Sequence, residues 1–341
     1  MRKTENDIVE RLKSSSRLAA AGRRSLPMGI GDDAALFVPT PGYQTILTCD
    51  WFLEGTHFLR EKHPADSVGW KCLARALSDV AAMGGKPRCF LLNLALPKTH
   101  IGRWFDDFLG GLNRAAHKFA CLLVGGDTSR QEKILINVTV IGEVRTGQAV
   151  LRSGAKPGDA IFVSGRLGEA ELGLRRLRKT KGRVHKSDLR LKKHLYPEPR
   201  FALGQWLAKN RLATSMMDLS DGLSTDLHRL CAASRVGARI DATKIPTVKI
   251  RGNDILFRTR QSIGQPKNRP RIALDLALNG GDDYELLFTV PKAKLGAIPA
   301  SFKSTRLTYV GVTSSTKRIV LTDFAGAEAL MPSDGWDSFR S

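Results

Sequence analysis

The sequence has few acidic residues and no long apolar run. Asp and Glu together number 33, against 54 Lys and Arg, which gives a formal net charge of +21. This excess of positive charge favours anionic partners such as nucleotides, phosphorylated metabolites or nucleic acid. No apolar run reaches the roughly 18 residues that a membrane-spanning helix needs, so we expect no membrane association.

Sequence patterns typical of several enzyme and metal-site classes are absent. The five cysteines show no CxxC spacing, and the polar residues 1–7 contain no apolar signal core. We therefore expect a cytoplasmic protein with reduced, mostly buried thiols. The chain has no HExxH motif and no GxSxG elbow, so we expect neither zinc nor serine-hydrolase chemistry.

Phosphate-binding signatures of the common kinds are also missing. There is no Walker P-loop, and the formal GxGxxA match at residues 29–34 lacks the hydrophobic strand that must precede a dinucleotide fingerprint. Any phosphate site must therefore use another architecture.

The chain does contain four acidic, glycine-containing motifs at the ends of apolar runs: residues 29–33, 125–128, 218–222 and 280–285. Few basic residues interrupt them. Carboxylates placed in turns without cationic partners repel one another, and they stay ionised together when a positive group binds there. Because Mg²⁺ prefers oxygen ligands and bridges carboxylates to phosphates, the motifs predict a site for Mg²⁺ and a polyphosphate.

Some of these residues also have structural explanations when each is taken alone. Asp32-Asp33 could form a tight turn, Ser220 and Asp221 could cap a helix, and His57 could be a polar loop histidine. Four such motifs in one chain are difficult to explain by turns and caps alone.

Two aspartates carry more information. Asp79 lies on a predicted helix of small apolar residues, where an unpaired carboxylate costs free energy unless something compensates it. Asp127 follows two glycines after a predicted buried strand, and glycines there let the backbone approach a phosphate closely.

The length of 341 residues is enough for two domains with full cores. The turn at 155–159 is the best place to divide them, which gives domains 1–154 and 155–341. Many strands look apolar on one side only, which predicts an α+β fold with mixed β-sheets covered by helices on one face. Among the expected elements are helices at 7–22 and 64–83, strands at 88–96, 134–144 and 272–278, and a mobile connection at about 246–270.

Two basic segments have no assigned role, one at 175–193 and one within 246–270. A basic stretch of this kind is more often a solvated surface than a nucleic-acid site, and no recognised nucleic-acid-binding module or interleaved aromatics accompany it. We therefore do not expect nucleic acid as a partner.

The motifs in their order resemble the thiamine-monophosphate kinase family, of the aminoimidazole-ribonucleotide-synthetase-like ATP-binding superfamily, over nearly the whole chain. The motifs that carry the resemblance are Gly-Ile-Gly-Asp-Asp-Ala-Ala at 29–35, Gly-Thr-His-Phe at 55–58, Leu-Ser-Asp-Val-Ala-Ala-Met-Gly at 77–84, Val-Gly-Gly-Asp-Thr at 124–128, Arg-Ser-Gly-Ala-Lys-Pro-Gly-Asp at 152–159, Asp-Leu-Ser-Asp-Gly-Leu at 218–223 and Gly-Gly-Asp-Asp-Tyr-Glu-Leu at 280–286. No single motif is specific, but the set is.

The resemblance implies an N-terminal domain that forms a homodimer through its sheet, with ATP bound between the two domains. It implies transfer of a phosphoryl group from ATP to thiamine monophosphate, giving thiamine diphosphate, with several Mg²⁺ ions. By motif position the metal ligands would be Asp33, Thr48, Cys49, Asp50, Asp79, Asp127, Asp218 and Asp221, of which Asp79, Asp127 and Asp218 would be catalytic. ATP would contact Gly126, Arg152 and Ser220, and thiamine monophosphate would contact His57, Asp282 and Trp336.

The sequence departs from the family pattern at two positions. The family usually has Thr where Cys49 stands, a change without effect if the metal contact is a backbone carbonyl. The family often has Glu where Asp282 stands, and the shorter side chain puts its reach to substrate in question.

Two other functions remain open. One is another ATP-dependent enzyme of the superfamily, such as aminoimidazole ribonucleotide synthetase or a hydrogenase-maturation protein. The other is a basic protein that binds nucleotides or nucleic acid without catalysis. The motif around His57 and the Asp334-Gly335-Trp336 segment favour the thiamine enzyme.

Overall fold

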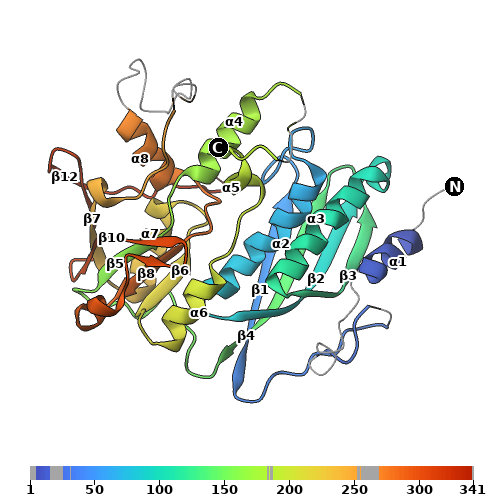
Figure 1. Ribbon diagram of the computed structural model, residues 1–341, viewed down its shortest axis with the longest axis horizontal. Coiled ribbons are helices and arrows are strands. Elements are labelled where there is room, and N and C mark those ends of the chain that lie inside the picture. The colour runs from blue at the N-terminus through green and yellow to red at the C-terminus, as the bar shows by residue number, and fades with distance from the viewer. Residues whose placement is uncertain are drawn as a thin grey trace. The chain divides into compact units, whose positions relative to one another are not determined.

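The computed structural model describes residues 5–15, 26–30, 32–182, 184, 187–251, 254 and 269–339. These residues form two compact units (Figure 1). The first unit falls within 1–80, 85–147 and 180–188, and the second within 81–84, 148–179 and 189–341. The division of the chain after residue 154 stays a prediction.

The first unit is built on a four-stranded mixed sheet with the strand order β1-β4-β2-β3. β1 and β2 each pair antiparallel with β4, whereas β2 and β3 are parallel. A parallel pair needs a crossover connection, which α3 supplies. The bounds are α1 Glu5–Ser15, β1 Tyr43–Leu53, α2 Ala65–Ala82, β2 Lys86–Leu96, η2 Lys98–His100, α3 Arg103–Phe119, β3 Leu122–Arg130 and β4 Leu135–Arg145.

Helices α2 and α3 lie side by side against one face of this sheet (Figure 1). The amphipathic sequence of α3 buries Phe105, Phe108 and Leu112 completely. Two glycines allow the two helices to approach closely. A Cβ on Gly69 would lie 2.0 Å from the Phe108 carbonyl oxygen, and one on Gly111 would lie 1.7 Å from that of Asp66.

The second unit is built on an eight-stranded mixed sheet in which β12-β11-β7-β10-β5-β8-β6 follow one another and β9 pairs with β10. Only β7 and β11 are parallel among these pairs. The strands are β5 Ala160–Ser164, β6 Ser215–Asp218, β7 Gly237–Asp241, β8 Leu286–Val290, β9 Ser301–Phe302, β10 Thr305–Ser314, β11 Ile319–Thr322 and β12 Glu328–Leu330. The helices are α4 Glu169–Lys179, α5 Lys192–Leu195, α6 Phe201–Lys209, α7 Leu223–Ser234, η3 Ala242–Lys244, α8 Arg269–Asn279 and η5 Lys292–Ala297.

The α+β class and the mixed sheets are confirmed, but the expectation that strands are apolar on one side only is wrong for the centre of the second sheet. Every residue of β5, β6 and β8 is buried. Ile161 and Val163 pack into a core with α7, whereas Ala160 and Phe162 pack into a core with α6. Because neighbouring side chains of a strand point to opposite faces, the sheet is covered on both faces.

Two of the expected elements differ from the structure. The strand expected at 272–278 is wrong, because these residues form most of helix α8. The buried residues of this helix follow a helical spacing: Ile272, Ala273, Leu276 and Ala277. In the sequence, a short apolar run of this kind fits a strand as well as a helix. The helix expected at 7–22 occupies 5–15, and its remaining positions lie outside the described residues. So does most of the connection expected at 246–270.

None of the helices in the described part of the chain is long and apolar enough to cross a membrane.

Candidate functional site

A cavity of about 790 Å³ in the first unit brings together two of the acidic motifs. Asp32 and Asp33 line it from one segment, and Gly126 and Asp127 line it from β3. Much of the remaining wall is apolar, including Leu91 of β2 and side chains of α1. A cavity of this size with an apolar wall and a few converging polar groups is typical of a small-molecule site.

Backbone geometry fixes the position of Asp127 in this cavity. Gly126 has a φ of +148°, and a Cβ there would lie 1.8 Å from the carbonyl oxygen of Leu92 on the adjacent strand. Only glycine fits, so β3 can approach β2 closely and present Asp127 next to it. The Asp127 carboxylate accepts a hydrogen bond of 2.9 Å from the backbone N–H of Thr128.

A second group of expected residues lies on β1 and α2. The Thr48 hydroxyl donates a hydrogen bond of 2.5 Å to the Asp79 carboxylate, so two predicted metal ligands 31 positions apart are in contact. Asp50, on the same face of β1 as Thr48, lies 3.4 Å from Nε of Arg75. Asp50, which lies outside the four acidic motifs, thus has a cationic partner that α2 supplies.

Cys49 points to the opposite face of β1. Its Sγ lies 3.1 Å from Nδ2 of Asn137 and 3.5 Å from Oγ1 of Thr139, both on β4. The thiol is thus directed away from Thr48 and Asp50, since successive residues of a strand alternate between faces. A metal contact at this position would have to use the backbone carbonyl, which does not depend on Cys or Thr.

His57 lies in the turn that follows β1 and is half-buried. Its Nδ1 accepts a hydrogen bond of 2.9 Å from the backbone N–H of Leu53, and its ring stacks on Phe52 at a centroid distance of 5.9 Å. These contacts fix the orientation of the imidazole and, because the hydrogen bond requires an unprotonated Nδ1, its tautomer.

In the second unit, a turn between β6 and α7 holds three separate segments together. The backbone N–H of Asp282 donates to the carbonyl oxygen of Ser220, and that of Trp336 donates to the carbonyl oxygen of Asp221, both at 2.8 Å. The structure thereby brings together four of the expected site residues from three motifs. A fifth, Asp218, is buried at the end of β6.

The fully buried carboxylate of Asp226, which sequence reasoning missed, organises this turn. Its Oδ2 accepts hydrogen bonds of 3.0 Å from the backbone N–H groups of both Ser220 and Asp221. Burial is the main cause that raises its pKa to about 7, and nearby Asp221 adds to it, whereas these hydrogen bonds and Arg229 oppose the rise. The available signal was an aspartate in the first turn of α7, four residues after Gly222.

Arg229 pairs with both Asp221 and Asp226. Asp221 is therefore an acidic-motif residue with a cationic partner, contrary to the expectation that these motifs have none, and Glu285 of the fourth motif is another. The N-cap of helix α7 is Gly222, and no side chain caps this end of the helix by a hydrogen bond. Capping by Ser220 or Asp221 therefore does not explain this motif.

Asp282 adopts a left-handed backbone conformation, with φ +69°, and so does Tyr284, with φ +50°. The Tyr284 hydroxyl donates a hydrogen bond of 2.7 Å to Oδ1 of Asp282, and Nδ1 of His194 lies 4.0 Å from Oδ2. Aspartate tolerates the left-handed region better than most residues because its short side chain can bond locally. The geometry thus gives a local reason for Asp at this position.

Trp336 and Arg152 are both accessible. The indole is 44% exposed and lines a cavity of about 340 Å³ together with Thr225, His228 and Arg229. The side chain of Arg152 is exposed, and its carbonyl oxygen accepts a hydrogen bond of 2.8 Å from the Ser234 hydroxyl at the end of α7.

The candidate ligands are carboxylates and a hydroxyl, which are hard oxygen donors and suit Mg²⁺ rather than zinc. Within the described residues, no three or more His, Cys, Asp or Glu side chains are grouped closely enough to hold a metal ion by themselves.

Comparisons with known proteins show the family to which the chain belongs. The family model "AIR synthase related protein, N-terminal domain" matches residues 31–144, and "AIR synthase related protein, C-terminal domain" matches residues 156–323. Thiamine-monophosphate kinase of Escherichia coli strain K12 is 40% identical over 281 residues, 82% of this chain and 81% of that protein. Thiamine-monophosphate kinase of Bacillus subtilis strain 168 is 33% identical over 325 residues, 93% of this chain and 94% of that protein.

Solved structures give the same result. The crystal structure of thiamine-monophosphate kinase from Stenotrophomonas maltophilia K279a has a TM-score of 0.75 and 34% identity, and the match covers 92% of this chain and 95% of that one. The structure "AaThiL complexed with AMPPCP and TMP" has a TM-score of 0.72 and 31% identity, covering 98% and 97%. The hydrogenase maturation protein HypE of E. coli has a TM-score of 0.73 at 18% identity, which shows a shared fold only.

Proposed function

The chain belongs to the thiamine-monophosphate kinase family, and we propose that it transfers a phosphoryl group from ATP to thiamine monophosphate, giving thiamine diphosphate and ADP. The curated relatives that match it over most of its length are enzymes of that name. A relative that matches 98% of this chain is complexed with AMPPCP and TMP.

One structural observation carries the proposal within this chain. The second unit ties Ser220, Asp221, Asp282 and Trp336 together by backbone hydrogen bonds, although these residues come from three distant segments. A turn assembled in this way places a candidate ATP contact, a candidate metal ligand and two candidate substrate contacts side by side. A structural role for each residue separately would not require this assembly.

The acceptor chemistry suits a site without a strong general base. A phosphate monoester has a second pKa of about 6, so the attacking oxygen is already largely anionic near neutral pH. The main difficulty is to bring two polyanions together in line. Carboxylates that hold metal ions and an arginine that contacts phosphate address this by neutralising charge and fixing positions.

We assign the aspartates the role of holding Mg²⁺, which when bound would neutralise phosphate charge. Asp33 and Asp127 would act in the first-unit cavity, Thr48, Asp50 and Asp79 on β1 and α2, and Asp218 and Asp221 at the turn of the second unit. The Cys49 backbone carbonyl, rather than its thiol, would contribute near them.

The other side chains would bind the two substrates. Gly126, Arg152 and Ser220 would contact ATP, Arg152 through its exposed guanidinium. His57, Asp282 and Trp336 would contact thiamine monophosphate. The half-exposed indole of Trp336 can offer its face to the thiazolium cation.

We further propose a cytoplasmic homodimer formed through the sheet of the first unit. β1 is an edge strand of 11 residues, and Tyr43, Leu47 and Trp51 on one of its faces are 39%, 70% and 55% exposed. These side chains lie on the face of β1 opposite Thr48 and Asp50. An apolar strip on an exposed sheet edge favours pairing with a second copy.

The decisive experiment is to measure ADP release with thiamine monophosphate, thiamine and aminoimidazole precursors under identical conditions. Release that depends on thiamine monophosphate, with thiamine diphosphate as product, supports the proposal. Turnover only with an aminoimidazole precursor would instead assign the chain to another activity of the superfamily.

A further inference from the structure

The second unit contains another cavity, of about 510 Å³, whose lining is strongly basic. It is formed by the loop after β5, the segment from α5 to α6, residues 246–249 and the start of β10. Its cationic lining residues are Arg166, Lys192, Lys193, Arg200, Lys249 and Arg306, and its acidic ones are Glu169 and Glu198. None of the residues proposed above for ATP, metal or thiamine monophosphate lines it.

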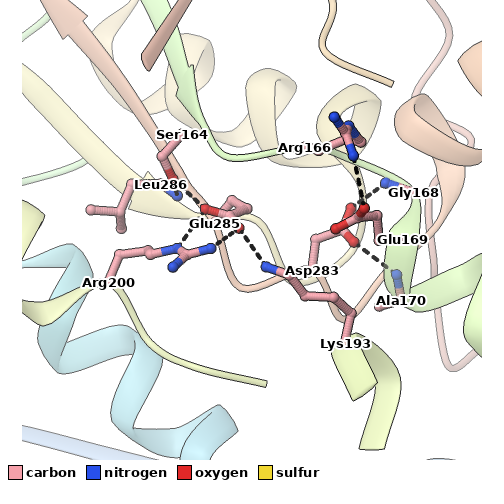
Figure 2. Close-up of polar contacts among 10 residues, drawn as sticks. All are labelled: Ser164, Arg166, Gly168, Glu169, Ala170, Lys193, Arg200, Asp283, Glu285 and Leu286. Carbon is pink, nitrogen blue, oxygen red and sulfur yellow. Dashed lines mark hydrogen bonds and ion pairs between the residues drawn. The ribbon is translucent and has the colours of Figure 1, made fainter. Parts of the chain in front are cut away.

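A buried carboxylate anchors two of these cations (Figure 2). Glu285 is fully buried and accepts hydrogen bonds from Lys193 Nζ at 3.0 Å, Arg200 Nε at 2.6 Å and the Ser164 hydroxyl at 2.6 Å. Burial alone would raise the pKa of Glu285, but the bonds from Arg200 and Lys193 and the hydroxyl of Ser164 bring it below its ordinary value. Glu285 is therefore ionised and holds both cations in place.

Arg200 uses only part of its guanidinium on Glu285. Nε and Nη2 face the carboxylate, whereas Figure 2 shows the third nitrogen turned away from it. Because Arg200 also lines the cavity, its remaining N–H groups are available to a ligand there. An arginine fixed by a buried partner loses little side-chain entropy when it binds an anion.

The outer cations have no comparable compensation. Lys192, Lys249 and Arg306 are exposed, and none of them has an ion pair within the described residues. Arg166 lies 3.3 Å from Glu169. The lining thus holds six cations and two carboxylates, and much of that positive charge faces solvent. Cations gathered in a concave site raise the local concentration of anions.

We propose that this cavity is a second anion-binding site, which takes a small phosphate-bearing molecule. Arg200 and Lys193 form its fixed inner part, and Arg166, Lys192, Lys249 and Arg306 form its outer part. Hydroxyl groups of Thr247, Ser304 and Thr305 also line the cavity and suit a polar rather than an apolar ligand. The volume lies within the range of small-molecule pockets. The six cations carry more positive charge than is needed to neutralise one phosphate group.

The test is calorimetric titration of pyrophosphate, the probe, into the full-length protein in the presence of a metal chelator. Without free metal, binding of phosphate through metals on the aspartates does not contribute. The double variant Lys249→Glu with Arg306→Glu reverses two exposed charges of the cavity and should weaken binding about tenfold or more, since each tenfold corresponds to about 1.4 kcal/mol. The matched control is Lys209→Glu with Lys292→Glu, two exposed lysines of the same unit outside this cavity, and it should change affinity less than about twofold.

Two further variants sharpen the result. Arg200→Lys keeps a cation beside Glu285 but removes the third nitrogen, so it should also weaken binding. If it does not fold, the double variant still decides the matter. Asp127→Asn should leave pyrophosphate binding unchanged, because Asp127 lies in a different cavity.

The proposal is overturned if the wild-type protein shows no pyrophosphate binding at millimolar concentration. Equal losses in the cavity variant and its control would show a general charge effect instead of a site, and a change of affinity in either direction in Asp127→Asn would assign the binding to the first unit. None of these outcomes bears on whether thiamine monophosphate is the acceptor, which the ADP-release experiment tests separately.

Discussion

The backbone N–H of Trp336 donates a hydrogen bond of 2.8 Å to the carbonyl oxygen of Asp221. This contact spans more than 100 positions of the chain and fixes the C-terminal segment to the turn that carries a proposed ATP contact and a proposed metal ligand. It uses the backbone of Trp336, so the indole is left half-exposed and can serve a ligand.

The first prediction concerns this indole. Trp336→Ala should weaken thiamine monophosphate binding several-fold to about thirtyfold, because an indole face stabilises a cation by roughly 0.5–2 kcal/mol. Trp336→Phe should retain much of the affinity. Both should keep the backbone hydrogen bond to Asp221 and spare ATP binding. Calorimetric titration of both ligands into both variants measures this, and equal losses for the two ligands would mean that Trp336 supports the fold.

Replacing Asp79 or Asp127 by Asn should leave the protein folded and lower turnover about a hundredfold or more at saturating Mg²⁺, because phosphoryl transfer depends on its metals. Asp79→Asn keeps an oxygen for the Thr48 hydroxyl. Asp107→Asn, an exposed position on α3, is the matched control and should retain full turnover. The measurement is steady-state ADP release with circular dichroism as the check on folding. Near-normal turnover in both variants would remove these residues from the metal site.

Arg152→Lys should raise the KM for ATP by about tenfold with little change in melting temperature. The planar guanidinium can contact phosphate through two nitrogens, and an ammonium cannot reproduce this geometry. Arg178→Lys, at an exposed position of α4, should behave like the wild type. A large fall in melting temperature for Arg152→Lys, with an unchanged KM, would identify Arg152 as a structural residue instead.

The fourth prediction concerns Asp283, whose carboxylate accepts hydrogen bonds from the backbone N–H groups of Gly168 and Ala170 at 2.5 and 3.0 Å (Figure 2). Burial is the main cause that raises its pKa from 3.8 to about 7, with a further contribution from Glu285. Between these two values the folded state retains a proton that the unfolded chain has released. The contribution of Asp283 to stability is therefore fully present below about pH 4 and is lost as the pH rises toward 7.

The difference between a pKa of 3.8 and one of about 7 corresponds to a change on the order of 4 kcal/mol in the free energy of unfolding. Asp283→Asn lacks this titration, so its free energy of unfolding should not show this fall. The amount by which the variant is less stable than the wild type should therefore shrink as the pH rises from about 4 to 7. Denaturant unfolding of both proteins at several pH values measures it, with Asp107→Asn as the control that should follow the wild type. Parallel pH profiles for wild type and Asp283→Asn would contradict the prediction.

Local sequence was sufficient for much of the architecture. The strands at 88–96 and 134–144 and the helix at 64–83 were predicted within a few residues, because each has a clear apolar period and a glycine or proline near one end. The family followed from the order of the motifs. The strand expected at 272–278 is wrong because the same kind of evidence is ambiguous there. A short apolar run fits the period of a helix or of a strand, and only its packing in the folded chain decides between them.

Contacts between distant segments required the folded chain. The sequence indicated Asp79 and Thr48 separately, but their hydrogen bond depends on how α2 lies on β1. Asp226 holds the turn of Ser220 and Asp221, and Glu285 fixes Arg200. The positions of these two carboxylates in the sequence indicate neither role.

By itself, then, the sequence determined which residue types stand at the end of each element, because helix and strand periods and turn chemistry are local properties of the backbone. Tertiary structure alone decided which of these residues meet and which carboxylates gain a cationic partner. It also decided which carboxylates lose water and so change their pKa. The pairs of Asp50 with Arg75 and of Glu285 with Arg200 join residues 25 and 85 positions apart, and local periodicity does not encode such contacts or the burial that accompanies them.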